Sequence, residues 1–229
     1  MWKEKGEAKH QRMLDIIQRL ERRFPGPHSI FVNQPFPLLI ATILSQNTSD
    51  VNSRRAFHNL EAQYAITPDV LASLSPKDIQ PYIKIAGLYR IRSQRIIDVS
   101  KILLERFQGD VWNILHLPVK IAREQLLEIP GVGPKTADIL LAFVTHQPTM
   151  PVDTNIFRVA LRIGIVNGRN YQRTQRALEE LIPNNKMQTM HLLLIQHGRA
   201  ICKPRTPLCQ QCPIDEFCEY PHKSSLRTI

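Results

Sequence analysis

Apolar residues recur along most of the chain at intervals of three to four positions, the spacing that lines one face of an α-helix. Near the N-terminus, Met13, Ile17, Leu20 and Phe24 keep this spacing while lysines and arginines lie between them. The pattern predicts an amphipathic helix with one apolar and one basic face. Residues 38–44 are apolar on nearly all sides and follow a proline that suits a first helical turn, so they predict a buried helix at the centre of the core.

Proline and glycine divide the rest of the chain into further helices. Thr67 and Ser75 each place a hydroxyl that can cap a helix directly before a proline that can begin it. Additional helices are predicted from apolar stripes over residues 51–64, 96–107, 122–129, 134–144, 153–163, 174–182 and 186–200. No segment sustains the alternation of a strand, and the expected fold class is therefore all-α.

Gly131, Val132 and Gly133 form a very short connection between two predicted helices. Glycine allows the positive φ and the close approach that so tight a turn requires. The turn also leaves main-chain N–H groups around Gly131, Gly133 and Lys135 pointing outward at a helix N-terminus, where they can bind an anion. The segment therefore indicates either a site for a DNA backbone phosphate or a purely structural helix–helix turn.

The charge of the chain points to an anionic partner. Thirty lysines and arginines against twenty aspartates and glutamates give a formal charge of +10, and the isoelectric point is about 9.7. Nucleic acid or an anionic membrane surface fits this excess, while the 43% hydrophobic content excludes a disordered tail or a fibre. No apolar run reaches the roughly 18 residues of a membrane-spanning helix, and no secretory signal pattern is present. The expectation is a soluble, cytoplasmic protein in a reducing compartment.

All four cysteines lie within one short segment near the C-terminus. Four thiolates so close in sequence can enclose a metal centre, and the prolines between them restrict the loop. A four-cysteine zinc site usually contains two close pairs, whereas only one is present, so the unequal spacing favours an iron–sulfur cubane. Zinc, two disulfides and four separate buried thiols remain the alternatives from spacing alone. The cysteines, with six, two and five residues between them, are Cys202, Cys209, Cys212 and Cys218.

Three motifs together resemble the helix-hairpin-helix (HhH-GPD) superfamily of DNA glycosylases. They are the glycine hairpin within residues 127–137, the segment Pro-Val-Asp-Thr-Asn-Ile-Phe-Arg-Val at 151–159, and the spacing of the four cysteines. The resemblance extends upstream through residues 35–50 and 82–89, so that it covers nearly the whole chain from about residue 10 to residue 222. The order and mutual spacing of the motifs agree with those of the superfamily, which makes the resemblance specific.

The resemblance implies an all-α fold of two lobes with an active-site cleft between them. One lobe would be a six-helix barrel over residues 28–148, with the helix-hairpin-helix motif at about 119–146. The other would join residues 1–27 to residues 149–229 and hold a [4Fe-4S] cluster in the loop 202–218. The four cysteines would be the ligands of this cluster.

The resemblance also implies an enzyme of base excision repair. Relatives of this kind flip an oxidised or otherwise damaged pyrimidine out of double-stranded DNA, cut its glycosidic bond and commonly nick the abasic strand by β-elimination. Lys135 matches the catalytic lysine, whose neutral amine would attack the sugar and form a Schiff base. Asp153 matches the catalytic aspartate and is also a favoured residue for capping the helix that it precedes. A uracil or thymine mismatch glycosylase and a non-catalytic iron–sulfur DNA-binding module are the alternatives.

The remaining candidate residues would hold the opened DNA. A flipped nucleotide leaves a gap in the base stack, which enzymes of this kind fill with a side chain. Leu88 is the apolar candidate, and either Gln46 or Asn47 matches the polar one. Lys203 and Arg205 lie inside the first cysteine loop, where they indicate a basic surface for phosphates or a merely solvated loop. The expected partner is damaged or abasic double-stranded DNA, bound by a monomer with an affinity that falls steeply as salt rises.

Overall fold

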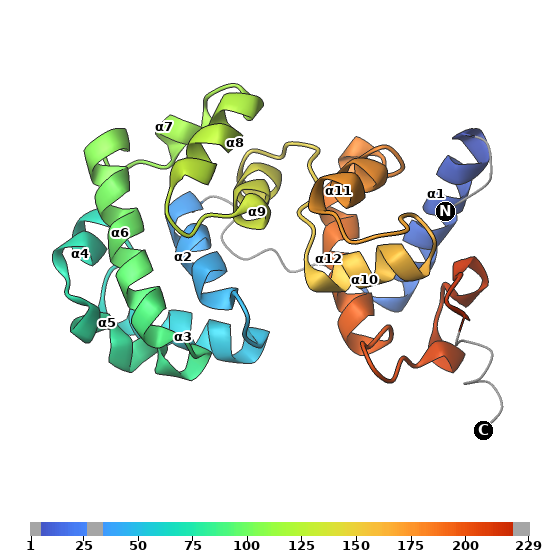
Figure 1. The fold of residues 1–229 in the computed structure, drawn as a ribbon, viewed down its shortest axis with the longest axis horizontal. Coiled ribbons are helices and arrows are strands. Elements are labelled where there is room, and N and C mark those ends of the chain that lie inside the picture. The colour runs from blue at the N-terminus through green and yellow to red at the C-terminus, as the bar shows by residue number, and fades with distance from the viewer. Residues whose placement is uncertain (1–5, 27–33, 222–229) are drawn as a thin grey trace. The chain divides into compact units, whose positions relative to one another are not determined.

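The structure of the protein is a computed structural model that describes residues 6–26 and 34–221. Every regular element in these residues is a helix, which confirms the predicted all-α fold class (Figure 1). The chain divides into two compact units, a discontinuous unit of Met1–His28 with Pro148–Ile229 and a continuous unit of Ser29–Gln147. Each unit has an apolar core of its own. None of the described helices is long and apolar enough to cross a membrane.

The continuous unit is built around α2 (Pro35–Ser45), the helix that the apolar run predicted. The other elements are α3 (Asp50–Gln63), α4 (Pro68–Ser73), α5 (Pro76–Ile83), the 3₁₀ helix η1 (Lys84–Ala86), α6 (Tyr89–Phe107), α7 (Trp112–Leu115), α8 (Val119–Glu128) and α9 (Pro134–Val144). The side chains of Leu39, Ile40, Ile43 and Leu44 have no exposed surface, and α2 packs against α3, α6 and α9. Burial of each such side chain stabilises the fold by about 2 kcal/mol.

Side-chain caps set the starts of the short helices. The Thr67 hydroxyl accepts a hydrogen bond from the main-chain N–H of Val70 (3.4 Å) at the start of α4. Before α5, the main-chain N–H and the hydroxyl of Ser75 both donate to Asp78 Oδ2, at 2.8 and 2.7 Å. These two donors, the hydroxyl first, lower the pKa of the Asp78 carboxyl. Both predicted helix starts are therefore confirmed.

The discontinuous unit packs the first helix of the chain against the last. Its elements are α1 (Gly6–Arg23), α10 (Thr154–Arg162), α11 (Tyr171–Glu179), the 3₁₀ helix η2 (Asn184–Lys186), α12 (Met187–Ala200), and the 3₁₀ helices η3 (Cys209–Gln211) and η4 (Asp215–Phe217). Helix α12 packs against both α1 and α10. The predicted apolar face of α1 is confirmed, because Met13, Ile17 and Leu20 lie in the core of this unit and Phe24 packs against it.

Helices α6, α8 and α11 begin at least three residues earlier than their apolar stripes indicated. Helix α11 begins at Tyr171, because Asn170 caps it by accepting the main-chain N–H of Arg173 (2.9 Å). Helix α6 begins at Tyr89, directly after Leu88, whose main chain has φ +50°. The Asn170 cap of α11 is polar, and the apolar residues at the other two starts, Leu88 and Val119, are exposed, so the buried stripe begins later than the helix.

Candidate active site

Residues 129–133 join α8 to α9 and form the hairpin that the sequence predicted. Gly131 has φ +85°, and a β-carbon at this position would collide with the side chain of Arg95. Gly133 is the N-cap residue of α9, and no side chain caps this helix. Val132 lies in the core with 5% of its surface exposed. Of the three residues predicted to contact a phosphate, Val132 therefore has a side chain that packs inward.

Lys135 occupies the second position of α9, directly after the hairpin, and is half-buried. The first turn of a helix exposes main-chain N–H groups and carries the positive end of the helix dipole, so it attracts anions. Pro134 begins the helix and has no N–H, so the donors at this end come from its neighbours.

A partly buried ion pair connects the helix that carries Lys135 to α8. Asp138, further along α9, has no exposed surface. Its carboxylate accepts hydrogen bonds from Arg123 Nε (2.7 Å) and Nη2 (3.3 Å) on α8. The pair joins the two helices on either side of the hairpin, so it holds the direction in which α9 leaves the turn.

Asp138→Ala is expected to lower the free energy of unfolding by about 2 to 3 kcal/mol, because it leaves the Arg123 guanidinium without this buried carboxylate. The matched control is Glu128→Ala, which removes an ion pair with Arg106 whose side chains are 42% (Arg106) and 51% (Glu128) exposed. Exposed pairs contribute under about 1 kcal/mol. Urea unfolding followed by circular dichroism measures both variants. Equal losses in the two would contradict a special contribution from the partly buried pair.

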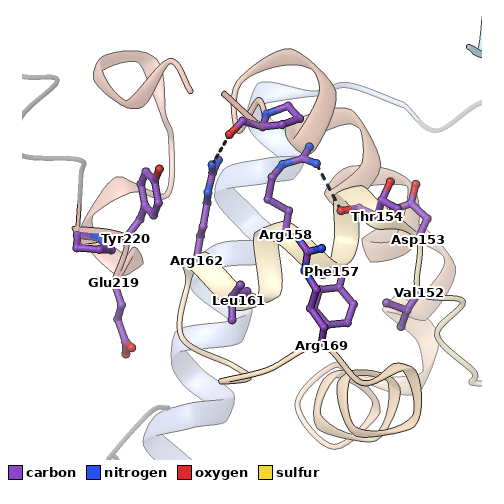
Figure 2. A pocket seen from close by; sticks show the side chains of 12 residues that line it. Val152, Asp153, Thr154, Phe157, Arg158, Leu161, Arg162, Arg169, Glu219 and Tyr220 are labelled. Carbon is purple, nitrogen blue, oxygen red and sulfur yellow. Dashed lines mark hydrogen bonds between the residues drawn. The ribbon is translucent and has the colours of Figure 1, made fainter. Parts of the chain in front are cut away.

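Asp153 caps α10, as its position before that helix predicted. Its Oδ1 accepts the main-chain N–H groups of Asn155 and Ile156, both at 2.8 Å, and its Oδ2 accepts the side-chain Nδ2 of Asn155 at 2.9 Å. The half-buried side chain lines an open pocket of about 700 Å³ within the discontinuous unit (Figure 2). Three N–H donors therefore fix the orientation of this carboxylate.

A chain of hydrogen bonds runs from Asp153 to the cysteine loop. Asn155, which donates to Asp153, accepts from Arg158 Nη2 (2.9 Å), and Arg158 Nε donates to the carbonyl of Cys202 (2.7 Å). Burial lowers the pKa of Arg158. Figure 2 shows Arg158 and Arg162 extending from α10 toward main-chain carbonyls. Sequence reasoning missed Arg158, although its helical spacing from Asn155 places both side chains on one face.

The four cysteines line one small pocket, and all of them, which lie in the described part of the chain, are free thiols. No disulfide joins any two of these four cysteines. Arg162 Nη1 donates to Cys202 Sγ (3.2 Å). Burial raises the pKa of Cys212 to about 12, so its thiolate requires positive charge nearby. Within the described residues, no three His, Cys, Asp or Glu side chains are grouped as ligands of a single metal ion.

Lys203 and Arg205 are both exposed on the first cysteine loop. Arg162 fixes the main chain of this loop, because its guanidinium donates to the carbonyls of Lys203 (2.8 Å) and Pro204 (2.9 Å). The same guanidinium lies over the ring of Tyr220, 4.3 Å from the ring centre. The two basic side chains therefore project from a main chain with a fixed shape.

The structure separates the two polar candidates for filling a gap in the base stack. The Gln46 amide is half-buried, donates to the carbonyl of Gly131 (3.2 Å) and accepts from Arg95 Nη1 (2.8 Å). Asn47 is exposed and has φ +52°. Leu88 is 56% exposed and has φ +50°, a left-handed conformation that is unusual for a bulky residue. Gln46 therefore points into the unit, whereas Asn47 and Leu88 lie at its surface.

The predicted site residues are divided between the two units. In the continuous unit, the turn that contains Gln46 lies against the hairpin that precedes Lys135. In the discontinuous unit, hydrogen bonds connect Asp153 to the loop that begins at Cys202. Lys135 and Asp153 belong to different units. The cleft expected between two lobes, and the roles of the two residues in it, stay predictions.

A family model and the sequence relatives of this chain point to the same family. The model of the HhH-GPD superfamily of base excision DNA repair proteins matches residues 40–184. Endonuclease III of Thermotoga maritima is 37% identical over 206 residues, which cover 90% of this chain and 92% of the relative. Endonuclease III of Escherichia coli strain K12 is 36% identical over 211 residues, which cover 92% and 96%.

Solved structures agree with the sequence relatives. A trapped covalent intermediate of endonuclease III with DNA is similar with a TM-score of 0.82 and 27% identity, covering 96% of this chain and 99% of that chain. A thermostable thymine-DNA glycosylase has the same fold, with a TM-score of 0.78, 22% identity and coverage of 95% and 98%. The fold is thus that of a helix-hairpin-helix DNA repair enzyme.

The chain belongs to the HhH-GPD superfamily of base excision DNA repair proteins and, within it, to the endonuclease III family. The predicted family and the predicted function as a base-excision-repair DNA glycosylase are confirmed. The four cysteines of the loop are free thiols that line one pocket.

Proposed function

We propose that the protein is a bifunctional DNA glycosylase and abasic-site lyase that removes oxidised pyrimidines from double-stranded DNA. The observation that carries the proposal is the place of Lys135 in the first turn of α9, directly after the glycine hairpin. A helix start that binds a DNA phosphate brings the amine of this lysine within reach of the adjoining sugar. The similar endonuclease III structure is a trapped covalent intermediate with DNA, the kind of species that an amine nucleophile leaves.

The chemistry begins when the neutral amine of Lys135 attacks C1′ of the flipped nucleotide. The new carbon–nitrogen bond replaces the glycosidic bond, and the departing base takes up a proton. Opening of the sugar ring gives a protonated Schiff base, which withdraws electrons and acidifies the proton on C2′. Removal of that proton expels the 3′ phosphate, so the strand breaks by β-elimination, and hydrolysis of the imine then releases the lysine.

Asp153 contributes through its charge. Cleavage of a glycosidic bond develops positive charge on the sugar, and a carboxylate that is already fixed in place stabilises this charge without reorganising. Hydrogen bonds from Asn155 and Ile156 hold both oxygens of Asp153 in this way. Because the two residues act on one nucleotide, the proposal requires Lys135 and Asp153 to reach the same sugar in the DNA complex.

The four cysteines are proposed to bind a [4Fe-4S] cluster. A four-cysteine zinc site usually contains two close pairs of ligands, whereas only Cys209 and Cys212 are so close here. A cubane attaches each thiolate to a different iron, so its ligands surround a wider space. The N–H that Arg162 donates to Cys202 Sγ also suits a thiolate ligand. When bound, the cluster would crosslink the loop that carries Lys203 and Arg205.

Cys212→Ser is expected to abolish the brown colour of the purified protein and its iron, about four atoms per chain. The side chain lines the cysteine pocket, and a serine hydroxyl is a poor substitute for a thiolate ligand. Visible absorption and iron analysis measure the effect. Thr206→Ser is the control, because it places serine in the same loop without removing a ligand. A colourless wild-type protein that contains zinc would contradict the cluster.

The intact protein tests the proposed function directly. Incubated with borohydride and a duplex that contains one abasic site, it is expected to form a covalent adduct, because borohydride reduces the Schiff base. Duplexes that each contain one oxidised pyrimidine, one uracil opposite guanine or one thymine opposite guanine then define the substrate. Excision only from the mismatches would favour a mismatch glycosylase. If the protein forms no adduct and excises no base from any duplex, the result would indicate a non-catalytic DNA-binding module.

A further inference from the structure

A buried arginine joins two turns of the continuous unit for which the family resemblance implies contact with DNA. Arg92 on α6 is 2% exposed. Its Nη1 donates to the carbonyls of Leu44 and Ala86, both at 2.8 Å, and its Nη2 donates to the carbonyl of Gln46. Leu44 and Gln46 lie at the end of α2, and Ala86 lies at the end of η1. One guanidinium therefore holds both turns.

The bonds of Arg92 indicate a positioning task rather than packing. Burial lowers the pKa of Arg92, and the neighbouring charge of Arg95 lowers it further. An apolar side chain would fill the same space without this electrostatic penalty. The bonds end on carbonyls at the C-terminal end of α2, where intrahelical partners run out and the negative end of the dipole attracts a cation. The charge is thus used to fix main chain.

Arg95, one turn further along α6, extends the connection to the hairpin. Its Nη1 donates to Gln46 Oε1 (2.8 Å), and Gln46 Nε2 donates to the carbonyl of Gly131 (3.2 Å). The stem of Arg95 occupies the space that a β-carbon on Gly131 would need. The turn after α2, the turn after η1 and the glycine hairpin are therefore all held against one face of α6.

The carbonyls that Arg92 binds are followed in sequence by the two exposed candidates for filling the gap in the base stack. Asn47 comes directly after Gln46, and Leu88 comes two residues after Ala86. Both are exposed, and their φ values are +52° and +50°. Such conformations persist in residues other than glycine only where the surroundings determine them, and they cluster at functional sites. Arg92 supplies such surroundings for both.

We infer that Arg92 is a positioning residue that holds Asn47 and Leu88 in place as preformed wedges, the side chains that fill the gap in the base stack of the opened duplex. Asn47, rather than Gln46, is then the polar residue that enters the gap. The inference rests on the proposed function, in which a nucleotide is flipped out of the stack. Unstacking costs a few kcal/mol. Wedges that are already in place avoid the additional loss of entropy from ordering two turns on binding. Arg92 itself does not touch the DNA.

The test compares Arg92→Met with the wild-type protein on two substrates. Both carry the same lesion, but in one duplex the nucleotide opposite the lesion is missing, so no base has to be supported there. On the complete duplex we expect kcat/KM to fall about tenfold or more, and on the gapped duplex to change less than about twofold. Arg92→Lys, which keeps a charged donor, should lose less on the complete duplex. Arg106→Met, the same substitution at an exposed site on α6, should match the wild type on both.

The ratio between the two substrates separates positioning from folding. Poor folding lowers the active fraction equally for both duplexes, and adduct formation with abasic DNA measures that fraction. If Arg92→Met does not fold, Arg92→Lys is compared on the same pair of substrates. Equal losses on the two duplexes would overturn the inference. A wild-type protein that is inactive on both would instead overturn the proposed function.

A double-mutant cycle identifies the wedge. Asn47→Ala is expected to show the same dependence on the opposite nucleotide as Arg92→Met, and the double variant should lose less than the product of the two single losses, because both changes remove one wedge. Gln108→Gly is the control for backbone strain, since Gln108 has φ +57° at the other end of α6. Multiplicative losses for Arg92 and Asn47 would contradict the assignment of Asn47.

Discussion

Lys135→Ala is expected to abolish the covalent adduct with abasic DNA and to lower the rate of strand scission by about 10³-fold or more. The variant removes the only group to which the proposed mechanism assigns bond formation with C1′. The hairpin amides and the partly buried Arg123–Asp138 ion pair remain, so affinity for undamaged DNA should change less than about threefold. Borohydride trapping, scored on a denaturing gel, measures the adduct.

The control for this experiment is Lys101→Ala, which removes an exposed lysine from α6 in the same unit. It should trap DNA as well as the wild-type protein does. An adduct that survives in Lys135→Ala at the wild-type rate would show that another amine is the nucleophile. Loss of the adduct in both variants would instead point to a general effect of positive charge on DNA binding.

Asp153→Asn is expected to reduce base excision by about 10² to 10⁴-fold while leaving the fold and DNA affinity nearly unchanged. Asparagine caps helices as well as aspartate does, so its side-chain oxygen can keep the main-chain bonds from Asn155 and Ile156. The negative charge that stabilises the sugar is lost. Single-turnover excision and thermal unfolding measure the two properties separately.

Two further variants divide the roles of Asp153. Asp153→Ala removes the cap as well as the charge, so it should cost about 1 kcal/mol of stability in addition to activity. Asn155→Ala leaves the carboxylate in place but breaks its link to Arg158, so its activity should fall between those of Asp153→Asn and the wild-type protein. Wild-type excision by Asp153→Asn would limit Asp153 to a capping role.

The fold was predictable to the extent that its signals are local. The apolar stripe of α1, the apolar run of α2 and the hydroxyl–proline starts of α4 and α5 all report a helix within a few residues of sequence. The start of α11 was not predictable from apolar spacing, because the Asn170 cap that sets it is polar. The same holds for α6, which begins after a left-handed Leu88 rather than after glycine or proline.

In the candidate site, too, the residues with local sequence signals were predictable and the others were not. Asp153 was predictable as a cap because an aspartate before a helix is a local signal, and the glycine hairpin was predictable for the same reason. Arg92 and Arg158 were not, because each binds carbonyls more than 40 residues away in sequence, at Leu44 and Cys202. A motif records residue types at fixed spacing, whereas these arginines act through main-chain atoms that only the folded chain brings to them.

The discontinuous core has a consequence for how the chain is made. The apolar face of α1, which includes Met13, Ile16 and Leu20, packs with residues as late as Ile214, and Arg12 donates to the carbonyl of Phe217 (2.6 Å). The ribosome needs roughly 10 to 40 s to travel from one to the other. The continuous unit can fold during that interval, whereas the apolar side chains of α1 stay unburied until the end of the chain has been synthesised. Incomplete translation products therefore display a surface that chaperones and proteases recognise, which links survival of the chain to completion of its cysteine loop.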